Sequence, residues 1–223
     1  MASDKRLSVN KLGEYMTATP SRRRQIIKDQ KTPSTFKVAR YNDARDVIVD
    51  YLTSGMSSDT EAMERAEELL SNSGRSEFTE QDRALSAEAI ESFLKVSDEI
   101  DIHGLQIESA DSFSDQSLEI GDVSVTMRPD AILRDEITGK IVGGVKLHFP
   151  KTYPLNDKGC EYVATALRFH LEGQDSPKSV DPKKCYVVDV HTQKVRMAPK
   201  AYKRCLSDIV AACEEISARW DSI

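Results

Sequence analysis

The chain has 223 residues, of which 39% are apolar and 30% are charged, and its formal net charge is −6. This length allows one sizeable hydrophobic core, or a core with a helical appendage. No apolar run approaches membrane-spanning length, and residues 1–10 lack the apolar segment of a secretion signal. The sequence therefore predicts a cytoplasmic protein without a membrane partner. The net charge does not exclude polyanionic partners, because residues 1–40 are rich in Lys and Arg whereas residues 41–122 are strongly acidic.

Helical periodicity dominates the first hundred residues. Ser8 is a candidate N-cap for a helix over residues 7–16, and the apolar spacing predicts further helices over 21–31, 42–52, 57–70 and about 80–100. In the second of these helices we expect Ile26 and Ile27 to face inward and Arg22, Arg23 and Arg24 to face outward. We divide the chain into an N-terminal helical region, basic and then acidic, over residues 1–78, and an α/β core over residues 79–223.

The core region alternates strands and helices. A strand is expected over residues 104–110, followed by two strands within 119–150, a helix over 156–172 and strands over 185–190 and 194–198. Pro199 suits the first position of a closing helix that ends near Trp220. Starting from the helix over 80–100, the order of elements is α-β-β-β-α-β.

The stretch from Glu119 to Pro150 carries the most chemical information. In its first strand Val123, Val125 and Met127 alternate with polar residues, and the same parity places Asp130 on the polar face. In its second strand Ile141, Val145, Leu147 and Phe149 share one face, and Gly144, Lys146 and His148 share the other. The residues from Asp135 to Gly139 suit a hairpin turn. Asp130 and Lys146 are therefore expected to project toward the same side of the sheet.

Three stretches resemble the PD-(D/E)XK nuclease superfamily, and within it the RecB-like branch, which includes the CRISPR adaptation exonucleases. RPDAIL followed by GKIVGGVKLHF is similar to the metal-binding hairpin of that branch, and LSVNKLGEYMTATPSRRR is similar to its helix-then-arginine opening. The helix with Lys158, Glu161 and Tyr162 stands where the branch has its Gln-x-x-x-Tyr motif. The resemblance implies a restriction-endonuclease-like core, a mixed central sheet flanked by helices, with extra N-terminal helices and a C-terminal helix.

The resemblance also implies roles for individual residues. Asp130 would be a catalytic metal ligand, Lys146 would stabilise negative charge in the transition state, and the backbone carbonyl of Val145 would be a further ligand. The cofactor would be Mg²⁺ or Mn²⁺ if the protein is active. The partner would be nucleic acid, with DNA favoured, and the candidate contacts are Arg22, Arg23, Arg24, Lys28, Lys158 and Tyr162. The three arginines are equally consistent with a solvated helix face.

The sequence departs from the family pattern at Gly144, which stands where the second acid is expected. One interpretation is an active metal-dependent deoxyribonuclease that takes the missing ligand from Glu161, Glu91 or His148. The interpretation we favour is a non-catalytic DNA-binding or scaffolding member of a DNA-processing or defence assembly, in which a protein complex can supply activity or specificity, because one carboxylate and one carbonyl make a poor Mg²⁺ site. A third is a protein-interaction adaptor with an acidic middle segment.

Structural explanations exist for each residue taken singly. Asp130 suits a turn after Pro129, an Asp–Lys pair across strands can be a surface ion pair, and Gly143 with Gly144 can mark a bulge or a close backbone approach. The four cysteines lack paired-ligand spacing, and Thr19 stands where iron–sulfur members of the branch have cysteine before proline. No iron–sulfur cluster is therefore expected. What favours the functional interpretation is Asp130 and Lys146 on one face within the right order of elements.

Overall fold

The computed structural model describes residues 5–32, 40–71, 76–112, 117–174 and 178–223. Its helices largely follow the predicted periodicity. Ser8 caps the first helix by accepting a hydrogen bond from the Lys11 backbone amide at 3.3 Å, and Thr19 does the same for the second, whose first residue is Pro20. The helices are α1 Val9–Thr17, α2 Pro20–Lys31, α3 Asn42–Thr53, α4 Asp59–Ser71, α5 Glu77–Leu94, α6 Asp157–Gln174 and α7 Lys203–Trp220.

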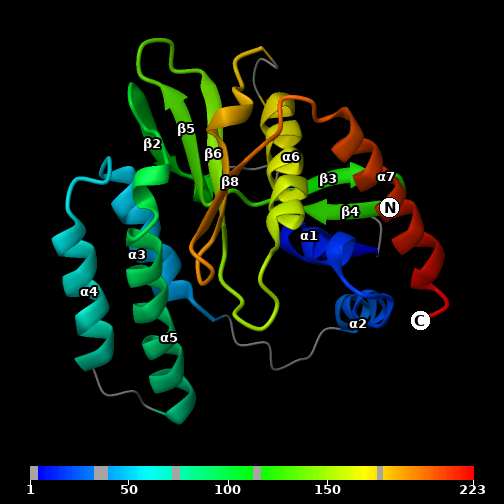
Figure 1. Ribbon diagram of the computed structural model, residues 1–223, viewed down its shortest axis with the longest axis horizontal. Helices are drawn as coiled ribbons and strands as arrows, with labels where there is room; N and C mark the ends of the chain where they lie inside the picture. The colour runs from blue at the N-terminus through cyan, green and yellow to red at the C-terminus, as the bar shows by residue number, and fades with distance from the viewer. Residues whose placement is uncertain (1–4, 33–39, 72–75, 113–116, 175–177) are drawn as a thin grey trace.

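A mixed five-stranded sheet forms the centre of the molecule (Figure 1), and its order is β2-β5-β6-β7-β8. The first three of these strands pair antiparallel, β7 runs parallel to β6, and β8 closes the edge antiparallel to β7. The parallel pair is connected through α6, as a crossover between parallel strands requires. The strands are β2 Leu105–Ser109, β5 Ala131–Asp135, β6 Ile141–His148, β7 Cys185–Asp189 and β8 Lys194–Met197.

A second, three-stranded sheet was not predicted from the sequence. Its order is β1-β4-β3, with β1 (Arg6–Ser8) parallel to β4 (Val123–Thr126) and β3 (Ser117–Ile120) antiparallel to β4. The predicted pairing of residues 123–128 with residues 141–149 is therefore wrong, because β6 pairs with β5 instead. The turn of this β5–β6 hairpin was predicted correctly, and the Asp135 side chain stabilises it by accepting hydrogen bonds from Thr138.

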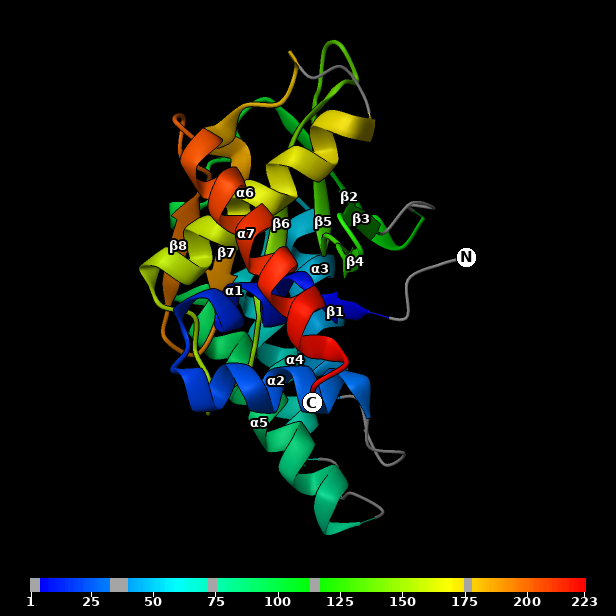
Figure 2. The same cartoon turned by 90° about the vertical axis from the view of Figure 1, so that its right-hand side faces the viewer.

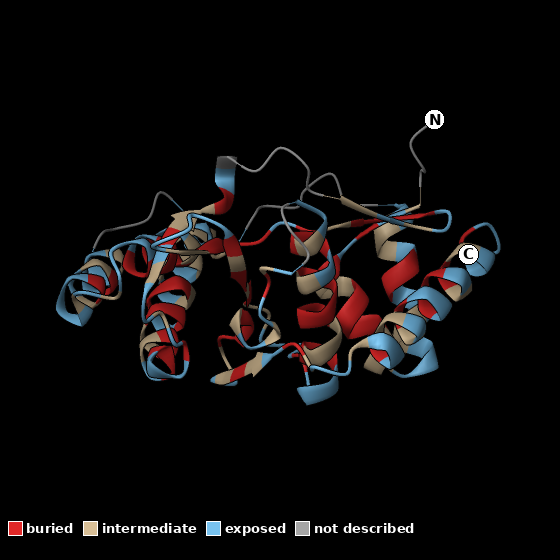
Figure 3. Cartoon of the chain, turned by 90° about the horizontal axis from the view of Figure 1, so that it is seen from above, coloured by how far each residue is buried: buried red, intermediate tan, exposed pale blue. Residues whose placement is uncertain are grey.

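Helices cover both faces of the five-stranded sheet (Figures 1 and 2). Alternate residues of β5 pack on opposite faces of the sheet. Ala131 and Leu133 belong to a core cluster with α3, α4 and α5, and Ile132 belongs to a second cluster with α1, α2, α6 and α7. Seen from above, buried residues line the inward faces of the helices and the strands between them (Figure 3). Both clusters contain residues from before and after residue 78, so the N-terminal helices share their cores with later elements.

Local differences from the predicted elements have identifiable causes. A register shift at Leu133 and Arg134 adds a residue to β6, and it places Ile141 in the α6-side cluster, opposite to the expected face. Helix α5 ends at Leu94 and is followed by a 3-10 turn over Ser97–Glu99, and α7 begins at Lys203 rather than at Pro199. None of the helices in the described part of the chain is long and apolar enough to cross a membrane.

Candidate anion-binding cleft

Asp130 lies where the chain leaves the three-stranded sheet and enters β5. Its backbone amide donates to the Val145 carbonyl at 2.8 Å, which extends the β5–β6 ladder by one residue. The residue is only 2% exposed, so the polar face on which it was predicted is buried at this position. Its carboxylate nevertheless points to the same side as Lys146, as expected, because Lys146 Nζ lies 2.7 Å from Asp130 Oδ2. The backbone amide of Leu147 donates to the same oxygen at 2.8 Å.

Arg45 is the partner of Asp130 that the sequence did not reveal. It extends from the first turns of α3, and its Nε donates to Asp130 Oδ1 at 2.7 Å while its Nη2 donates to Asp111 Oδ1 at 3.0 Å. Burial alone would lower the pKa of Arg45, but the hydrogen bonds to the two carboxylates outweigh it and raise the pKa. The hydrogen bond from Arg45, followed by one from Ser109, lowers the pKa of Asp111. Arg45 and Asp111 are thus both ionised near neutral pH.

These residues line a cleft of about 530 Å³. Its charged side chains comprise three cations, Arg45, Arg128 and Lys146, and two carboxylates, Asp111 and Asp130, so the cleft carries a net positive charge although the whole chain is negative. Such a local surplus attracts anions independently of the overall charge. The remaining lining residues are Asn10, Ala110, Pro129, Leu147 and Phe149.

Asn10 brings a polar group to the cleft from α1. Its Nδ2 donates to the Leu147 carbonyl at 2.9 Å, which fixes the orientation of the amide. The Oδ1 atom is then buried, and within the described residues it has no hydrogen-bond partner. A buried acceptor without a partner is costly, so this atom would gain from a donor supplied by a ligand or by water.

The predicted metal site does not fit the residues that the cleft contains. Both Asp130 oxygens already accept hydrogen bonds, two of them from cations, and the Val145 carbonyl accepts one from Asp130. Throughout the described ranges, no group of three or more His, Cys, Asp or Glu side chains is placed to hold a metal ion. Divalent hard cations prefer several oxygen ligands with few competing cations. The cleft instead has two carboxylates, and both are already paired with cationic side chains.

The packing around Gly144 leaves little room for the second acid that the resemblance predicts. A Cβ atom added at this residue would lie 2.9 Å from the Ala131 carbonyl oxygen and 3.2 Å from Leu171 Cδ1 on α6. The adjacent Gly143 is even tighter, because its Cβ would lie 2.0 Å from the Lys184 carbonyl oxygen. Both glycines therefore allow close backbone approach, and the position of the expected acid faces Leu167 and Leu171 on α6.

The three residues proposed to replace that acid lie outside the cleft lining. Glu161 forms an ion pair with Lys158 at 2.8 Å on α6, and Glu91 lies on α5, which packs on the other face of the sheet. His148 is 2% exposed, and its Nε2 lies 3.0 Å from the Tyr153 carbonyl oxygen. Burial lowers the pKa of His148, so the ring is neutral near neutral pH. A migrated ligand from these residues is thus not supported by the geometry.

The basic residues proposed as nucleic-acid contacts are likewise not among the residues that line the cleft. Arg22 pairs with Glu14 at 2.6 Å, and Arg23 donates to two backbone carbonyls of α1 and pairs with Glu215 at 3.3 Å. These two arginines therefore do not face outward as predicted. Arg24 and Lys28 are exposed on α2. On α6, Lys158 contacts Glu161 and the Cys205 sulfur, and the Tyr162 hydroxyl donates to Asp208 at 3.0 Å.

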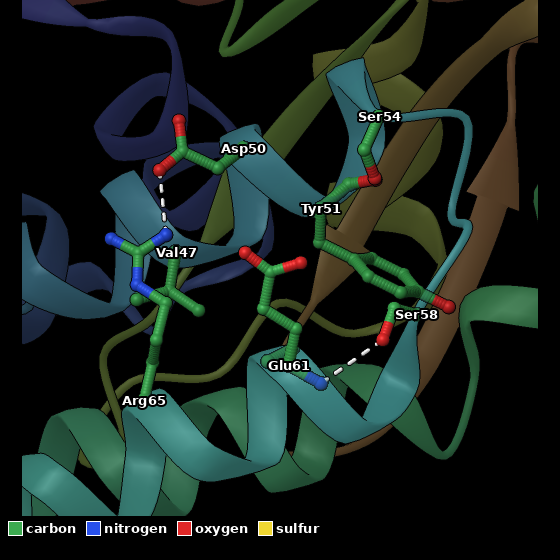
Figure 4. Close-up of a pocket in the computed structure, with 8 residues that line it drawn as sticks. Val47, Asp50, Tyr51, Ser54, Ser58, Glu61 and Arg65 are labelled. Carbon is green, nitrogen blue, oxygen red and sulfur yellow. Dashed lines mark hydrogen bonds and ion pairs between the residues drawn. The ribbon is translucent and has the colours of Figure 1, made fainter.

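A second cavity lies between α3 and α4 and is lined by polar side chains (Figure 4). Its volume is about 50 Å³, which suits water or a small ion and not a nucleotide. Arg65 Nη1 pairs with Asp50 Oδ2 there at 2.6 Å (Figure 4). Arg65 is therefore a useful control residue for the cleft, because it is an arginine that is ion-paired in a different cavity.

Sequence reasoning missed Arg45, Asp111 and Asn10. Arg45 is one of several charged residues on an amphipathic helix, and nothing in the local pattern distinguishes it from a solvated side chain. Asp111 and Asn10 likewise reach the cleft through tertiary contacts. No protein-family model matches the chain, and no curated protein matches it.

Proposed function

We propose that the chain is a non-catalytic member of the PD-(D/E)XK-like proteins that binds DNA in the Asp130 cleft, as a binding or scaffolding component of a DNA-processing assembly. The observation that carries the proposal is the state of Asp130, the residue expected to hold metal. Its carboxylate is neutralised by Lys146 and Arg45, and the other acid of the cleft, Asp111, is itself paired with Arg45. Among the described residues, no group of three or more possible ligands is placed to hold a metal ion.

The order of elements supports the family part of the proposal. Helix α5 is followed by β2, β5 and β6 as an antiparallel series, then by α6 and by β7 parallel to β6. This is the α-β-β-β-α-β order that the resemblance implies, with β3 and β4 inserted between the first and second strands. Because a fold supports many functions, the function itself rests on the cleft.

The charge of the cleft supports the nucleic-acid part. Arg128 is exposed and lines the cleft. Arg45 and Lys146 add two positively charged side chains, each of which is paired with Asp130. Phosphate groups bind such cations and release counterions, so affinity should fall as salt rises. A Mg²⁺ or Mn²⁺ cofactor is expected only in the alternative in which the protein is an active deoxyribonuclease.

A binding titration with matched variants tests the proposal. Fluorescently labelled DNA is titrated at several salt concentrations with the wild-type chain, Arg128→Gln and the control Arg65→Gln. We expect the wild type to bind with a salt-dependent affinity, and Arg128→Gln to bind more weakly with a salt slope reduced by about one. Arg65→Gln should match the wild type. Wild-type affinity that is absent or independent of salt would refute nucleic-acid binding.

A cleavage assay tests the non-catalytic part separately. Linear duplex and single-stranded DNA are incubated with the wild-type chain and Mg²⁺ or Mn²⁺, beside Asp130→Ala and Lys146→Ala. We expect no cleavage above that of the two variants, because the residues around Asp130 do not form a metal site. Cleavage by the wild type that vanishes in both variants would show that the protein is a metal-dependent nuclease.

A further inference from the structure

We propose that the Asp130 cleft selects single-stranded DNA and that Phe149 stacks on one of its bases, an inference that rests on the proposed DNA binding. Phe149 follows β6 directly and lines the cleft together with Lys146 and Arg45. It is partly exposed, so its ring is not fully used by the core. Aromatic rings beside cationic grooves are the general device for binding unpaired strands, because every base has a face that stacks.

Phe149 is held in place by a stack of rings. Tyr41 lies against it with ring centroids 5.4 Å apart and an interplanar angle of 12°. His191 contacts Tyr41 edge-on, with centroids 5.4 Å apart and an angle of 63°. Because Tyr41 covers one face of the Phe149 ring, a ligand in the cleft can contact only the other face or the edge of that ring. The pair thus forms a supported surface rather than a mobile side chain.

The start of α3 and the end of β6 each carry an aromatic residue and a cationic residue near the cleft. At the start of α3, Tyr41 and Arg45 are one helical turn apart, and the Arg45 amide donates to the Tyr41 carbonyl at 2.9 Å. At the end of β6, Lys146 lines the cleft three residues before Phe149. A nucleotide has the same two parts, an anionic phosphate and a flat base. The arrangement therefore matches one unpaired nucleotide, with the cations toward phosphate and Phe149 toward base.

Tyr41 adopts a backbone conformation that bulky residues rarely take. Its φ is 64°, in the left-handed region, where a side chain with a Cβ is strained. Its backbone amide donates to Asp82 Oδ1 at 3.2 Å, which ties the start of α3 to α5. A glycine or asparagine would adopt this conformation with less strain. The tyrosine thus carries an energetic cost in this conformation, and its ring supports Phe149.

Single strands are favoured over duplexes for a steric reason. In a duplex both faces of each base are covered by neighbouring bases, so a ring in a cleft can stack only on an unpaired base. An abasic strand offers the phosphates but no base on which the ring can stack.

The wild-type chain provides a first test without any substitution. Labelled single-stranded DNA, an abasic strand of the same length and a duplex of the same sequence are compared by fluorescence anisotropy at one salt concentration. We expect the single strand to bind most tightly, by about 5-fold to about 100-fold over the abasic strand for one stacked base. Equal affinity for all three would overturn the inference while leaving the proposed function intact, and no salt-dependent binding of any strand would overturn both.

Substitution of Phe149 provides a second test. Phe149→Leu keeps an apolar side chain against the core, Phe149→Trp keeps a stacking ring, and Phe169→Leu on α6 is the control, since Phe169 is 41% exposed and lines a different cavity. We expect only Phe149→Leu to lose the preference for the single strand over the abasic strand, with an unchanged salt slope. An unchanged preference in Phe149→Leu would refute the role of this ring.

Discussion

Replacing Asp130 by asparagine separates the two interpretations of the cleft. The amide has nearly the shape of the carboxylate, but its single oxygen cannot accept from all three donors, which are Arg45 Nε, Lys146 Nζ and the Leu147 amide. Its NH₂ group must also face one of these donors. Asp130→Asn therefore removes the carboxylate that pairs with Lys146 and leaves Arg45 with Asp111 alone, at a residue that is 2% exposed.

The expected cost follows from the burial of the three groups. Removing one partner of a fully buried ion pair typically costs about 3–5 kcal/mol. The Lys146 side chain is 13% exposed and the Arg45 side chain 31% exposed, so water can partly solvate them after the substitution. We therefore expect a loss of about 2–4 kcal/mol in the free energy of unfolding. In a chain of this size, that corresponds to a fall in Tm of about 4–16 °C.

Urea denaturation measures this loss, with Asp111→Asn as the control. Asp111 also pairs with Arg45, but its side chain is 71% exposed, so its loss should cost less than about 1 kcal/mol. Single-stranded DNA affinity is measured on the same samples at moderate salt. Because Asp130→Asn makes the cleft more positive, affinity should stay equal or rise. Unchanged stability, or a loss of DNA binding in the folded variant, would refute the description of Asp130 as a neutralised residue.

Three further predictions concern the surroundings of the cleft. Gly144→Glu should destabilise the protein by more than about 4 kcal/mol and not create a metal site, because its Cβ would lie 2.9 Å from a backbone oxygen; a cooperative urea transition near that of the wild type would contradict this. Since burial lowers the pKa of His148 below its ordinary value, the unfolded chain binds more protons there, and stability should fall as the pH is lowered through about 6.5, by at most about 1.4 kcal/mol per pH unit for this group. Urea midpoints across that range should show a weaker pH dependence in His148→Gln, and an identical slope would exclude His148 as the cause. The thiols should not react with a thiol reagent in the folded protein, since all four are buried and burial raises the pKa of three of them to about 12; rapid native labelling would argue against the packing of Cys160, Cys185 and Cys213.

The sequence predicted most helices because their signals are local. Ser8 and the apolar spacing after it define α1, and the residues from Asp135 to Gly139 define a turn, whichever elements pack around them. The pairing of the strands was not predictable in this way. The alternation of Val123 and Val125 fits an inward face in either sheet, and no local signal shows that the chain passes from one sheet to the other before Asp130.

The same distinction applies to the cleft. The pairing of Asp130 with Lys146 follows from the parity of neighbouring strands, so the sequence predicted it. The contact between Asp130 and Arg45 joins residues that are 85 positions apart, and only the packing of α3 beside β2 and β5 brings them together. The same contact decides the chemistry, because it places a guanidinium group beside Asp130, where the resemblance predicts a metal ion.

The close packing at Gly144 also determines which mutational paths remain open to this protein. A side chain at residue 144 would clash with the backbone oxygen of Ala131. Every residue type has this oxygen, so a substitution at residue 131 does not remove the clash. A carboxylate at residue 144 therefore requires a shift of the β5 backbone, which trimming α6 alone does not provide. The shortest route to a more acidic cleft begins at Arg45, whose side chain already reaches both Asp111 and Asp130.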